Sequence, residues 1–326
     1  QVLQAGINEL GATASWLAAA NSYSVNNQPM IPFFIYYSMF GFQRVGDMMW
    51  AAGDQLARGF MVGGTSGRTT LNGEGLQHED GHSHIQAGII PNCITYDPSF
   101  AFEVAVIMQD GINRMYGEKQ EDVFYYMTTL NEVMDQPAMP AGAEEGIRKG
   151  LYKFETVEGK KGKGHVQLLG SGAIMRHVRE AAQILANDYG VTSDVFSAPS
   201  FNELAREGHD AARWNLLHPT ETQRVPYVTQ VLADLPTVAS TDYVKGYADQ
   251  IRAFVPSKHY HVLGTDGFGR SDSRANLREH FEVDARYVVV AALSQLAKEG
   301  TVSNQVVADA IAKFGLNVDR INPLYA

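Results

Sequence analysis

Short apolar runs alternate with longer segments of helical spacing along the whole chain. Runs rich in Val, Ile, Phe and Tyr predict buried strands, whereas apolar residues at intervals of three and four predict helices with one buried face. The predicted strands are 31–37, 59–62, 93–96 and 123–129 in the first half, and 166–169, 194–198, 237–240 and 260–264 in the second half. This alternation is typical of an α/β fold with parallel sheets.

The helical pattern is clearest over 100–115, where apolar residues occupy positions 100, 104, 107, 108, 112 and 115. Further helices are predicted over 174–187, 202–214 and 284–299. Two prolines and a glycine between Gln136 and Gly142 interrupt the pattern, which predicts a domain boundary. We therefore expect two consecutive doubly wound domains with mainly parallel sheets, residues 1–138 and residues 139–326.

Composition and charge narrow the class of protein. The chain has 326 residues, 45% of them hydrophobic, and a formal net charge of −10, which gives no general attraction for nucleic acid or an anionic membrane. No run approaches the ~20 apolar residues of a membrane helix, and the first residues given lack the charged start and apolar stretch of a secretory signal. The lone Cys93 predicts a packing role in a reducing compartment, so we expect a cytoplasmic protein. The one basic run, 160–163, predicts a solvated hairpin tip.

Residues 73–84 form the most polar segment, with three histidines and three carboxylates. Positions 78–82 read His-Glu-x-x-His, which on a helix would bind zinc through His78 and His82 with Glu79 as the base of a hydrolase. The glycines of the segment each weaken a helix by roughly 1 kcal/mol relative to alanine. A zinc site, a structural polar loop and a site for an organic cofactor or substrate are therefore the three interpretations.

Two other features allow more than one interpretation. Glu9 lies among small and apolar residues, and its position is typical both of a solvent-facing helix residue and of a functional carboxylate. The aromatic run 33–37 and the nearby Phe40 are typical of a hydrophobic core, and equally of a surface on which a ring stacks.

Several separate strings carry a resemblance to a known family. They are Gln-Ala-Gly-Ile-Asn-Glu-Leu-Gly at 4–11, Tyr-Tyr-Ser-Met-Phe-Gly-Phe-Gln-Arg at 36–44, Thr-Thr-Leu-Asn-Gly-Glu-Gly-Leu-Gln-His at 69–78 and Gly-Thr-Asp-Gly-Phe-Gly-Arg-Ser-Asp at 264–272. Together they resemble the homodimeric, bacterial-type E1 components of pyruvate dehydrogenase complexes, and the resemblance covers essentially the whole chain.

The resemblance implies a pyrimidine-binding domain, incomplete at its N-terminal side, followed by a transketolase-type C-terminal domain. It implies oxidative decarboxylation of pyruvate with thiamin diphosphate, and transfer of the acetyl group to a lipoyl group on the E2 partner, dihydrolipoyl acetyltransferase, in acetyl-CoA synthesis. A transketolase-type ketol transferase and a catalytically silent dimerisation fragment are the alternatives.

The resemblance also assigns roles to single residues. Glu9 matches the glutamate that hydrogen-bonds N1′ of the aminopyrimidine, Phe40 the ring that stacks on it, and Tyr37 a cofactor-side or substrate-side contact. His78 resembles the imidazole that reaches the substrate. Further residues on the substrate side, or supporting it, are Glu74, His82 and Arg44. Ala5 departs from the pattern, because relatives often have an acidic residue there.

The family's magnesium motif, Gly-Asp-Gly followed by a distant asparagine, is absent from this sequence. The resemblance implies that the Mg²⁺ ligands belong to a domain upstream, so we expect no metal ligand here and half of each active site of a homodimer. The stretch 168–172 lacks a phosphate-loop pattern. We expect 264–272 to be a tight strand-to-helix connection and a dimer contact, and no catalytic residue after position 150.

Overall fold

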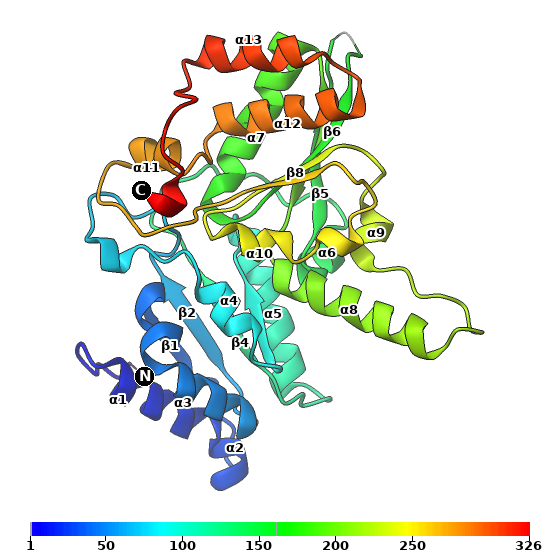
Figure 1. Cartoon of the computed structure of the whole chain (residues 1–326). Helices are drawn as coiled ribbons and strands as arrows, with labels where there is room; N and C mark the ends of the chain where they lie inside the picture. Colours follow the sequence, from blue (N-terminus) through cyan, green and yellow to red (C-terminus); the bar gives the residue numbers. More distant parts are fainter. Residues whose placement is uncertain (1, 161) are drawn as a thin grey trace.

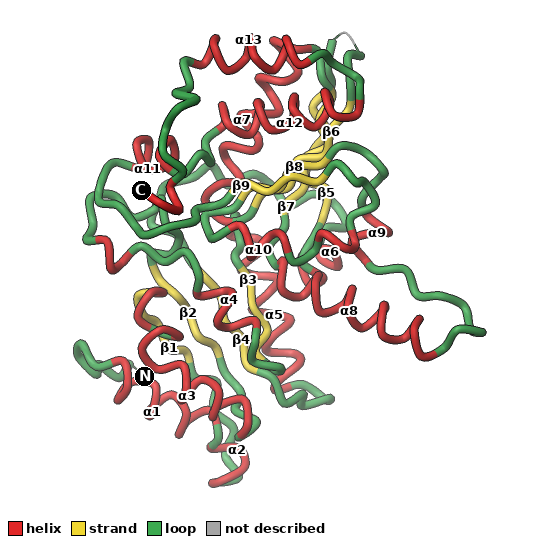
Figure 2. Tube along the Cα trace, in the orientation of Figure 1, coloured by secondary structure: helices red, strands yellow, loops and turns green. Residues whose placement is uncertain are grey.

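Two β-sheets, each covered by helices on both faces, make up the molecule (Figures 1 and 2). The computed structural model describes residues 2–160 and 162–326. Sheet A has four strands in the order β1-β2-β4-β3, and sheet B has five in the order β5-β7-β6-β8-β9. Within the described ranges, no helix is both long and apolar enough to cross a lipid bilayer.

Sheet A is parallel throughout. Its strands are β1 (Phe33–Tyr37), β2 (Phe60–Gly64), β3 (Cys93–Tyr96) and β4 (Phe124–Thr128). Its helices are α1 (Glu9–Ala20), α2 (Ser22–Val25), α3 (Phe42–Asp54), α4 (Ser83–Gly88) and α5 (Ala101–Tyr116). Alternate residues of β4 face opposite sides: Phe124 and Tyr126 pack with α1, α3 and α4, whereas Tyr125 and Met127 pack with α5.

Sheet B is parallel except at one edge, where β5 runs antiparallel to β7. Its strands are β5 (Tyr152–Val157), β6 (His165–Gly170), β7 (Thr192–Ser197), β8 (Thr237–Ser240) and β9 (Tyr260–Leu263). Its helices are α6 (Glu144–Lys149), α7 (Met175–Ile184), α8 (Phe201–Leu217), α9 (Tyr227–Val231), α10 (Lys245–Asp249), α11 (Arg274–His280), α12 (Ala285–Glu299) and α13 (Asn304–Phe314).

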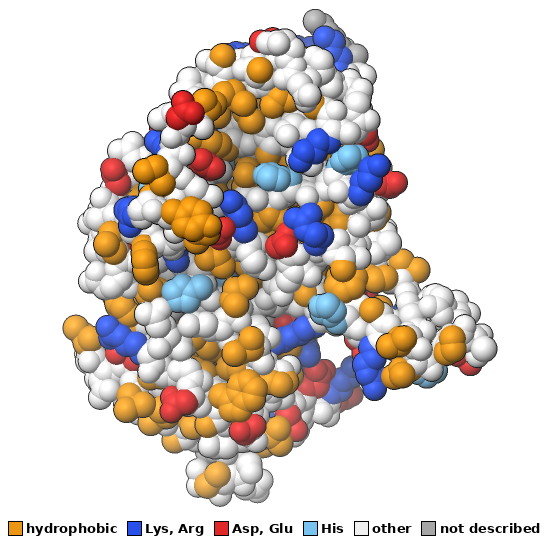
Figure 3. Space-filling view, in the orientation of Figure 1, with side chains coloured by type: hydrophobic (Ala, Val, Ile, Leu, Met, Phe, Trp, Pro, Cys, Tyr) orange, Lys and Arg blue, Asp and Glu red, His pale blue; other side chains and the backbone are white. Residues whose placement is uncertain are grey.

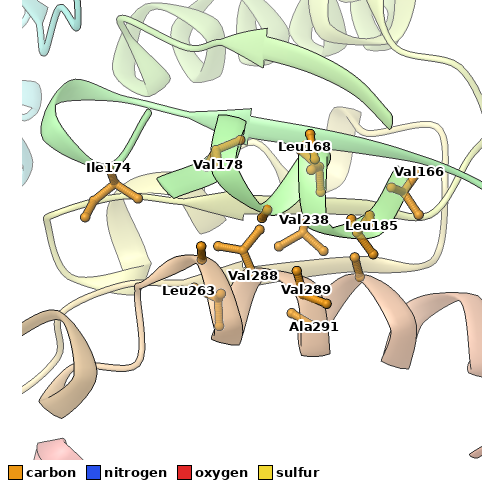
Figure 4. Close-up of a cluster of buried hydrophobic side chains, with 14 of the residues drawn as sticks. Val166, Leu168, Ile174, Val178, Leu185, Val238, Leu263, Val288, Val289 and Ala291 are labelled. Atoms are coloured by element: carbon orange, nitrogen blue, oxygen red, sulfur yellow. The ribbon is translucent and has the colours of Figure 1, made fainter. Parts of the chain in front are cut away.

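Two apolar layers hold sheet B between its helices. On one face, Val and Leu side chains of β6 and β8 pack against α7 and α12, as Figure 4 shows for Leu168, Val238 and Val288. On the other face, residues such as Leu169 and Ala239 pack against α8, α9 and α10. Both faces of these strands are buried, which explains why they appear in the sequence as continuous apolar runs.

The predicted strands all occur, with ends shifted by a few residues, and the predicted fold class is confirmed. The edge strand β5 was missed, because Lys153 and Glu155 break its apolar run. The predicted hairpin tip at 160–163 is wrong, since the flanking strands β5 and β6 do not pair with each other. Lys161 lies outside the described residues.

The two sheets meet across a polar interface. We propose that the boundary lies between residues 138 and 139, and we call the two parts the first and second domains. Asp242, after β8, accepts hydrogen bonds from the Thr69 amide at 3.0 Å and from the hydroxyls of Thr69 and Thr70 at 2.7 Å. From α8, Arg206 donates to the main-chain oxygens of Gly88, Ile90 and Cys93. The first domain therefore occupies the carboxyl ends of the sheet B strands, where doubly wound sheets commonly bind ligands.

Asp97 lies at the centre of this interface and is fully buried. It accepts hydrogen bonds from the hydroxyls of Thr128 at 2.7 Å and Ser171 at 2.9 Å. Within the described ranges, no arginine or lysine side chain is hydrogen-bonded to it. Burial, reinforced by the nearby Asp242 and Glu103, raises the pKa of Asp97 to about 7.

Replacement of Asp97 by Asn should change how stability depends on pH. An unfolded aspartate has a pKa of about 3.9, so between about pH 4 and pH 7 the folded protein retains a proton that the unfolded chain has lost. The free energy of unfolding therefore decreases as the pH rises through this interval. Asp97→Asn removes this contribution, and its stability relative to wild type should increase from pH 4 to pH 7 in urea denaturation. The exposed Asp234→Asn serves as the control; equal pH slopes for both variants would contradict the assignment.

Candidate active site

A pocket of about 650 Å³ opens at the carboxyl ends of β1 and β2, beside the start of α1. It brings together the predicted site residues Glu9, Tyr37, Phe40, Arg44 and His78. The other lining residues are Gly6, Ile7, Asn8, Ala12, Phe34, Ile35, Tyr36, Gly64, Thr65 and Gln77. Segments separated by about seventy positions in the sequence thus meet at the carboxyl ends of these two strands.

Glu9 is the first residue of α1, and the preceding residue caps the helix. The Asn8 side chain accepts the Gly11 amide at 2.9 Å, and a carboxylate in the first turn is favoured by the helix dipole. The Glu9 side chain is 18% exposed, and its Oε1 lies 3.2 Å from Nη1 of Arg44. The helix therefore holds a carboxylate at the pocket wall.

Phe40 ends the 3₁₀ turn Ser38–Phe40 that joins β1 to α3. The Arg44 guanidinium carbon lies 4.0 Å from the centre of its ring, in a cation–π arrangement. Because the same guanidinium contacts Glu9, Arg44 connects the carboxylate with the aromatic ring.

His78 ends the 3₁₀ turn Leu76–His78 and is partly buried. Its ring packs edge-on against Phe40, with centroids 5.0 Å apart, and against Tyr37 at 5.4 Å. Its Nδ1 is buried and has no hydrogen-bond partner among the described residues. A buried polar nitrogen without a partner is unusual in a folded protein and is available to a ligand.

Thr65 also lines the pocket, and sequence reasoning missed it. It follows β2 with a φ of +48°, which is strained for a β-branched residue, and its buried Oγ1 has no partner among the described residues. Backbone strain of this kind is frequent at functional sites. No pattern in the sequence reports it, because the strain arises from the path of the chain.

Glu74 and His82 do not line this pocket. Glu74 is exposed, whereas the Nε2 of His82 lies 2.7 Å from the Oε1 of Gln43 on α3. Burial lowers the pKa of His82. In this chain His82 therefore connects the polar segment to α3.

The arrangement does not suit the zinc interpretation. His78 lies in a 3₁₀ turn and His82 precedes the separate helix α4, so the two imidazoles do not share a helix face. Glu79 between them is buried and accepts the Arg270 amide. His84 points into the core, where burial lowers its pKa to about 3. Within residues 2–160 and 162–326, no three His, Cys, Asp or Glu side chains are grouped to hold a metal ion.

The pocket is open on one side, where large apolar residues are exposed. Ile7 is 97% exposed, Ile35 71% and Tyr37 49%. Figure 3 shows apolar side chains on the surface around α1 and α3. Apolar surface of this extent marks a face that binds another molecule or another part of a protein.

Comparison with known proteins identifies relatives for both domains. Residues 1–137 match the family model of the pyruvate dehydrogenase E1 component middle domain, and residues 150–284 match the transketolase-like C-terminal domain. The pyruvate dehydrogenase E1 component of Haemophilus influenzae is 99% identical over 326 residues, which are 100% of this chain and 37% of that protein. The Escherichia coli K12 protein of the same name is 72% identical over all of this chain and 36% of its own length.

Solved structures show the same fold at low identity. Transketolase from Campylobacter jejuni has a TM-score of 0.64 and 16% identity, covering 85% of this chain and 38% of that chain. Transketolase from Leishmania mexicana has a TM-score of 0.61 and 18% identity, covering 88% of this chain and 37% of that chain.

The chain thus spans little more than a third of the length of the curated relatives that it matches. The near-complete identity over all of this length, together with the middle-domain match, makes the chain closely similar to one part of the pyruvate dehydrogenase E1 components.

Proposed function

We propose that this chain provides the pyrimidine-side half of the active site of a pyruvate dehydrogenase that uses thiamin diphosphate. The reaction is the oxidative decarboxylation of pyruvate, with transfer of the acetyl group to lipoyl-E2. The observation that supports this most strongly is that Glu9, Phe40 and His78 line one pocket in a chain that is 99% identical to part of a pyruvate dehydrogenase E1 component. The transketolase structures support the fold alone.

The pocket suits the aminopyrimidine end of thiamin diphosphate. It offers a carboxylate at Glu9 and an aromatic ring at Phe40. Beside them, His78 has a buried nitrogen without a partner among the described residues, which is left for the substrate. Its lining contains no cluster of side chains suited to Mg²⁺, so the diphosphate and its Mg²⁺ would be held by another part of the protein. When bound, the cofactor supplies a thiazolium ring that acts as an electron sink for decarboxylation.

Glu9 would hold a proton at N1′ of the aminopyrimidine, which is acid–base catalysis applied to the cofactor. Arg44 donates to Oε1 of this carboxylate, so Oε2 is the oxygen that we assign to N1′. Phe40 and Tyr37 would fix the orientation of the ring, since an offset aromatic stack adds about 0.5–1.5 kcal/mol beyond burial. His78 would bind the pyruvate carboxylate as a cation or move a proton on the substrate.

The remaining assignments concern the assembled enzyme. Glu74 and His82 are proposed as substrate-side or supporting residues that act once the open side of the pocket is covered. A homodimer would cover the open side of the pocket, because a two-fold interface places the partner's surface against the same surface of this chain. The exposed Ile7 and Ile35 support such a contact. We place the enzyme in the cytoplasm, where a buried reduced Cys93 is expected.

Substitution of Glu9 tests the proposed function. Glu9→Ala and Glu9→Gln, made at the corresponding position of the full-length H. influenzae relative, should lower kcat by about 10² or more, because acid–base catalysis contributes about 10²–10⁴-fold. The assay is pyruvate-dependent reduction of an artificial electron acceptor with added thiamin diphosphate and Mg²⁺. Circular dichroism should show an intact fold, and Glu118→Ala, at an exposed glutamate, should behave as wild type. Turnover by Glu9→Ala close to wild type would sink the assignment.

Assays of the same wild-type protein distinguish this function from its two alternatives, a transketolase and a catalytically silent dimerisation fragment. A transketolase would transfer ketol groups between sugar phosphates at a rate above its pyruvate activity. A dimerisation fragment would remain silent with pyruvate even in the full-length protein. We expect pyruvate activity that disappears when thiamin diphosphate is withheld.

Phe40→Leu tests the proposed stacking contact. Loss of about 0.5–1.5 kcal/mol should weaken binding of thiamin diphosphate by about 2- to 12-fold in calorimetric titration. Phe33→Leu is the matched control, because Phe33 lies on β1, the strand that precedes Phe40, stacks on Phe60 and does not line the pocket. Equal affinities of the two variants would argue against Phe40 as the stacking ring.

A further inference from the structure

The loop that carries His78 rests on a segment of the second domain. Residues 267–272, between β9 and α11, lie against residues 68–79 of the first domain, and we call this segment the platform. The Gly73 amide donates to the Asp272 main-chain oxygen at 2.9 Å, and the Arg68 guanidinium donates to the Gly267 oxygen. Both ends of the platform, Gly267 and Asp272, therefore contact the loop.

Glu79, directly after His78, makes the central contact. The residue is 1% exposed, and its Oε2 accepts the Arg270 amide of the platform at 2.7 Å. Burial raises the pKa of Glu79 to about 8, so the carboxyl is neutral at pH 7. A neutral acceptor is sufficient for this hydrogen bond, and a glutamine at this position would provide one.

Gly269 makes the close approach of the two segments possible. A Cβ on this residue would lie 2.8 Å from the Leu76 main-chain oxygen and 2.9 Å from the Glu79 Cβ. Leu76 begins the 3₁₀ turn that ends at His78. Any side chain at 269 would therefore push this turn away from the platform, and the imidazole would move with it.

In the pocket, His78 contacts aromatic residues of the first domain. Its ring packs against Phe40 at 5.0 Å and Tyr37 at 5.4 Å. The imidazole thus lies between the aromatic wall of the pocket and a turn that the second domain supports. The orientation of His78 depends on both domains.

We propose that Glu79 and Gly269 are positioning residues, through which the second domain sets the orientation of His78 in the pocket. The catalytic consequence rests on the proposed function, whereas the anchoring of the turn does not. The segment 264–272 is therefore more than the strand-to-helix connection expected from the sequence. The second domain would contribute to catalysis without a residue that touches the substrate.

The test compares Glu79→Ala, Glu79→Gln and Gly269→Ala with Gly246→Ala, at the corresponding positions of the full-length H. influenzae relative. Gly246 is the matched control, because an added Cβ meets nothing within 4 Å. Four quantities are measured: hydrogen–deuterium exchange of the peptide covering 73–79, kcat and KM for pyruvate, and the Kd for thiamin diphosphate.

Glu79→Ala and Gly269→Ala should exchange faster over 73–79 and lose about 10- to 100-fold in kcat, since a displacement of about 1 Å can cost about 10²-fold. The Kd for thiamin diphosphate should stay within about 2-fold of wild type, because Glu9 and Phe40 are untouched. Glu79→Gln retains the acceptor and should restore exchange and kcat, and Gly246→Ala should match wild type. A general loss of stability would instead raise exchange throughout the protein.

Unchanged exchange over 73–79 in Glu79→Ala and Gly269→Ala would overturn the proposal. Faster exchange with a wild-type kcat would also overturn it, because the turn would then be anchored without effect on catalysis. If Gly269→Ala fails to fold, the Glu79→Ala and Glu79→Gln pair decides the question. Absence of pyruvate turnover in the wild-type protein would contradict the proposed function. The exchange data would still show whether the platform anchors the turn that ends at His78.

Discussion

The docking of the first domain onto the carboxyl ends of the sheet B strands is the constraint on which the rest of the structure depends. Three fully buried or nearly buried carboxyls lie there, Asp97, Glu103 and Asp242. Hydroxyl groups contributed by the opposite domain satisfy each of them: Ser171 donates to Asp97, Ser197 and Tyr152 to Glu103, and Thr69 and Thr70 to Asp242. Because a buried polar group without a partner costs about 1–3 kcal/mol, the two sheets are held in one relative orientation.

This orientation explains why the segment 73–84 is so polar. Consecutive residues of this segment contact different parts of the molecule. His78 packs against the aromatic residues of the pocket, and Glu79 contacts the platform. Asp80 lies at the start of α4, where it accepts hydrogen bonds from the amides of His82 and Ser83. His84 then enters the core against Tyr243 and Tyr247 of the second domain. One short segment thus connects the pocket to the interface, and its polar groups are distributed among partners rather than gathered around a metal.

Much of the fold follows from the sequence, because strands buried on both faces must be apolar along their whole length. The same rule did not predict β5. This strand lies at the edge of sheet B, and its apolar residues alternate with polar ones that include Lys153 and Glu155. In the site, the residues alone allowed Glu9 to be a solvent-facing helix residue and Phe40 to be a core aromatic. The family resemblance indicated their functional roles. Glu9 and Phe40 line the same pocket as His78, whereas Glu74 and His82 lie outside it. The spacing of residues along a loop does not determine the direction of each side chain, so the sequence could not separate these two from His78. The strained Thr65 and the contact at Gly269 depend on long-range packing, which no local pattern reports.

The pocket beside Glu9 is the proposed site of the aminopyrimidine ring of thiamin diphosphate. A crystal structure of the full-length H. influenzae relative with thiamin diphosphate bound tests this most directly. We expect N1′ within hydrogen-bonding distance of the Glu9 carboxylate, the ring against Phe40, and the diphosphate outside the residues that line this pocket. A cofactor bound elsewhere, with Glu9 still engaged only by Arg44, would contradict it.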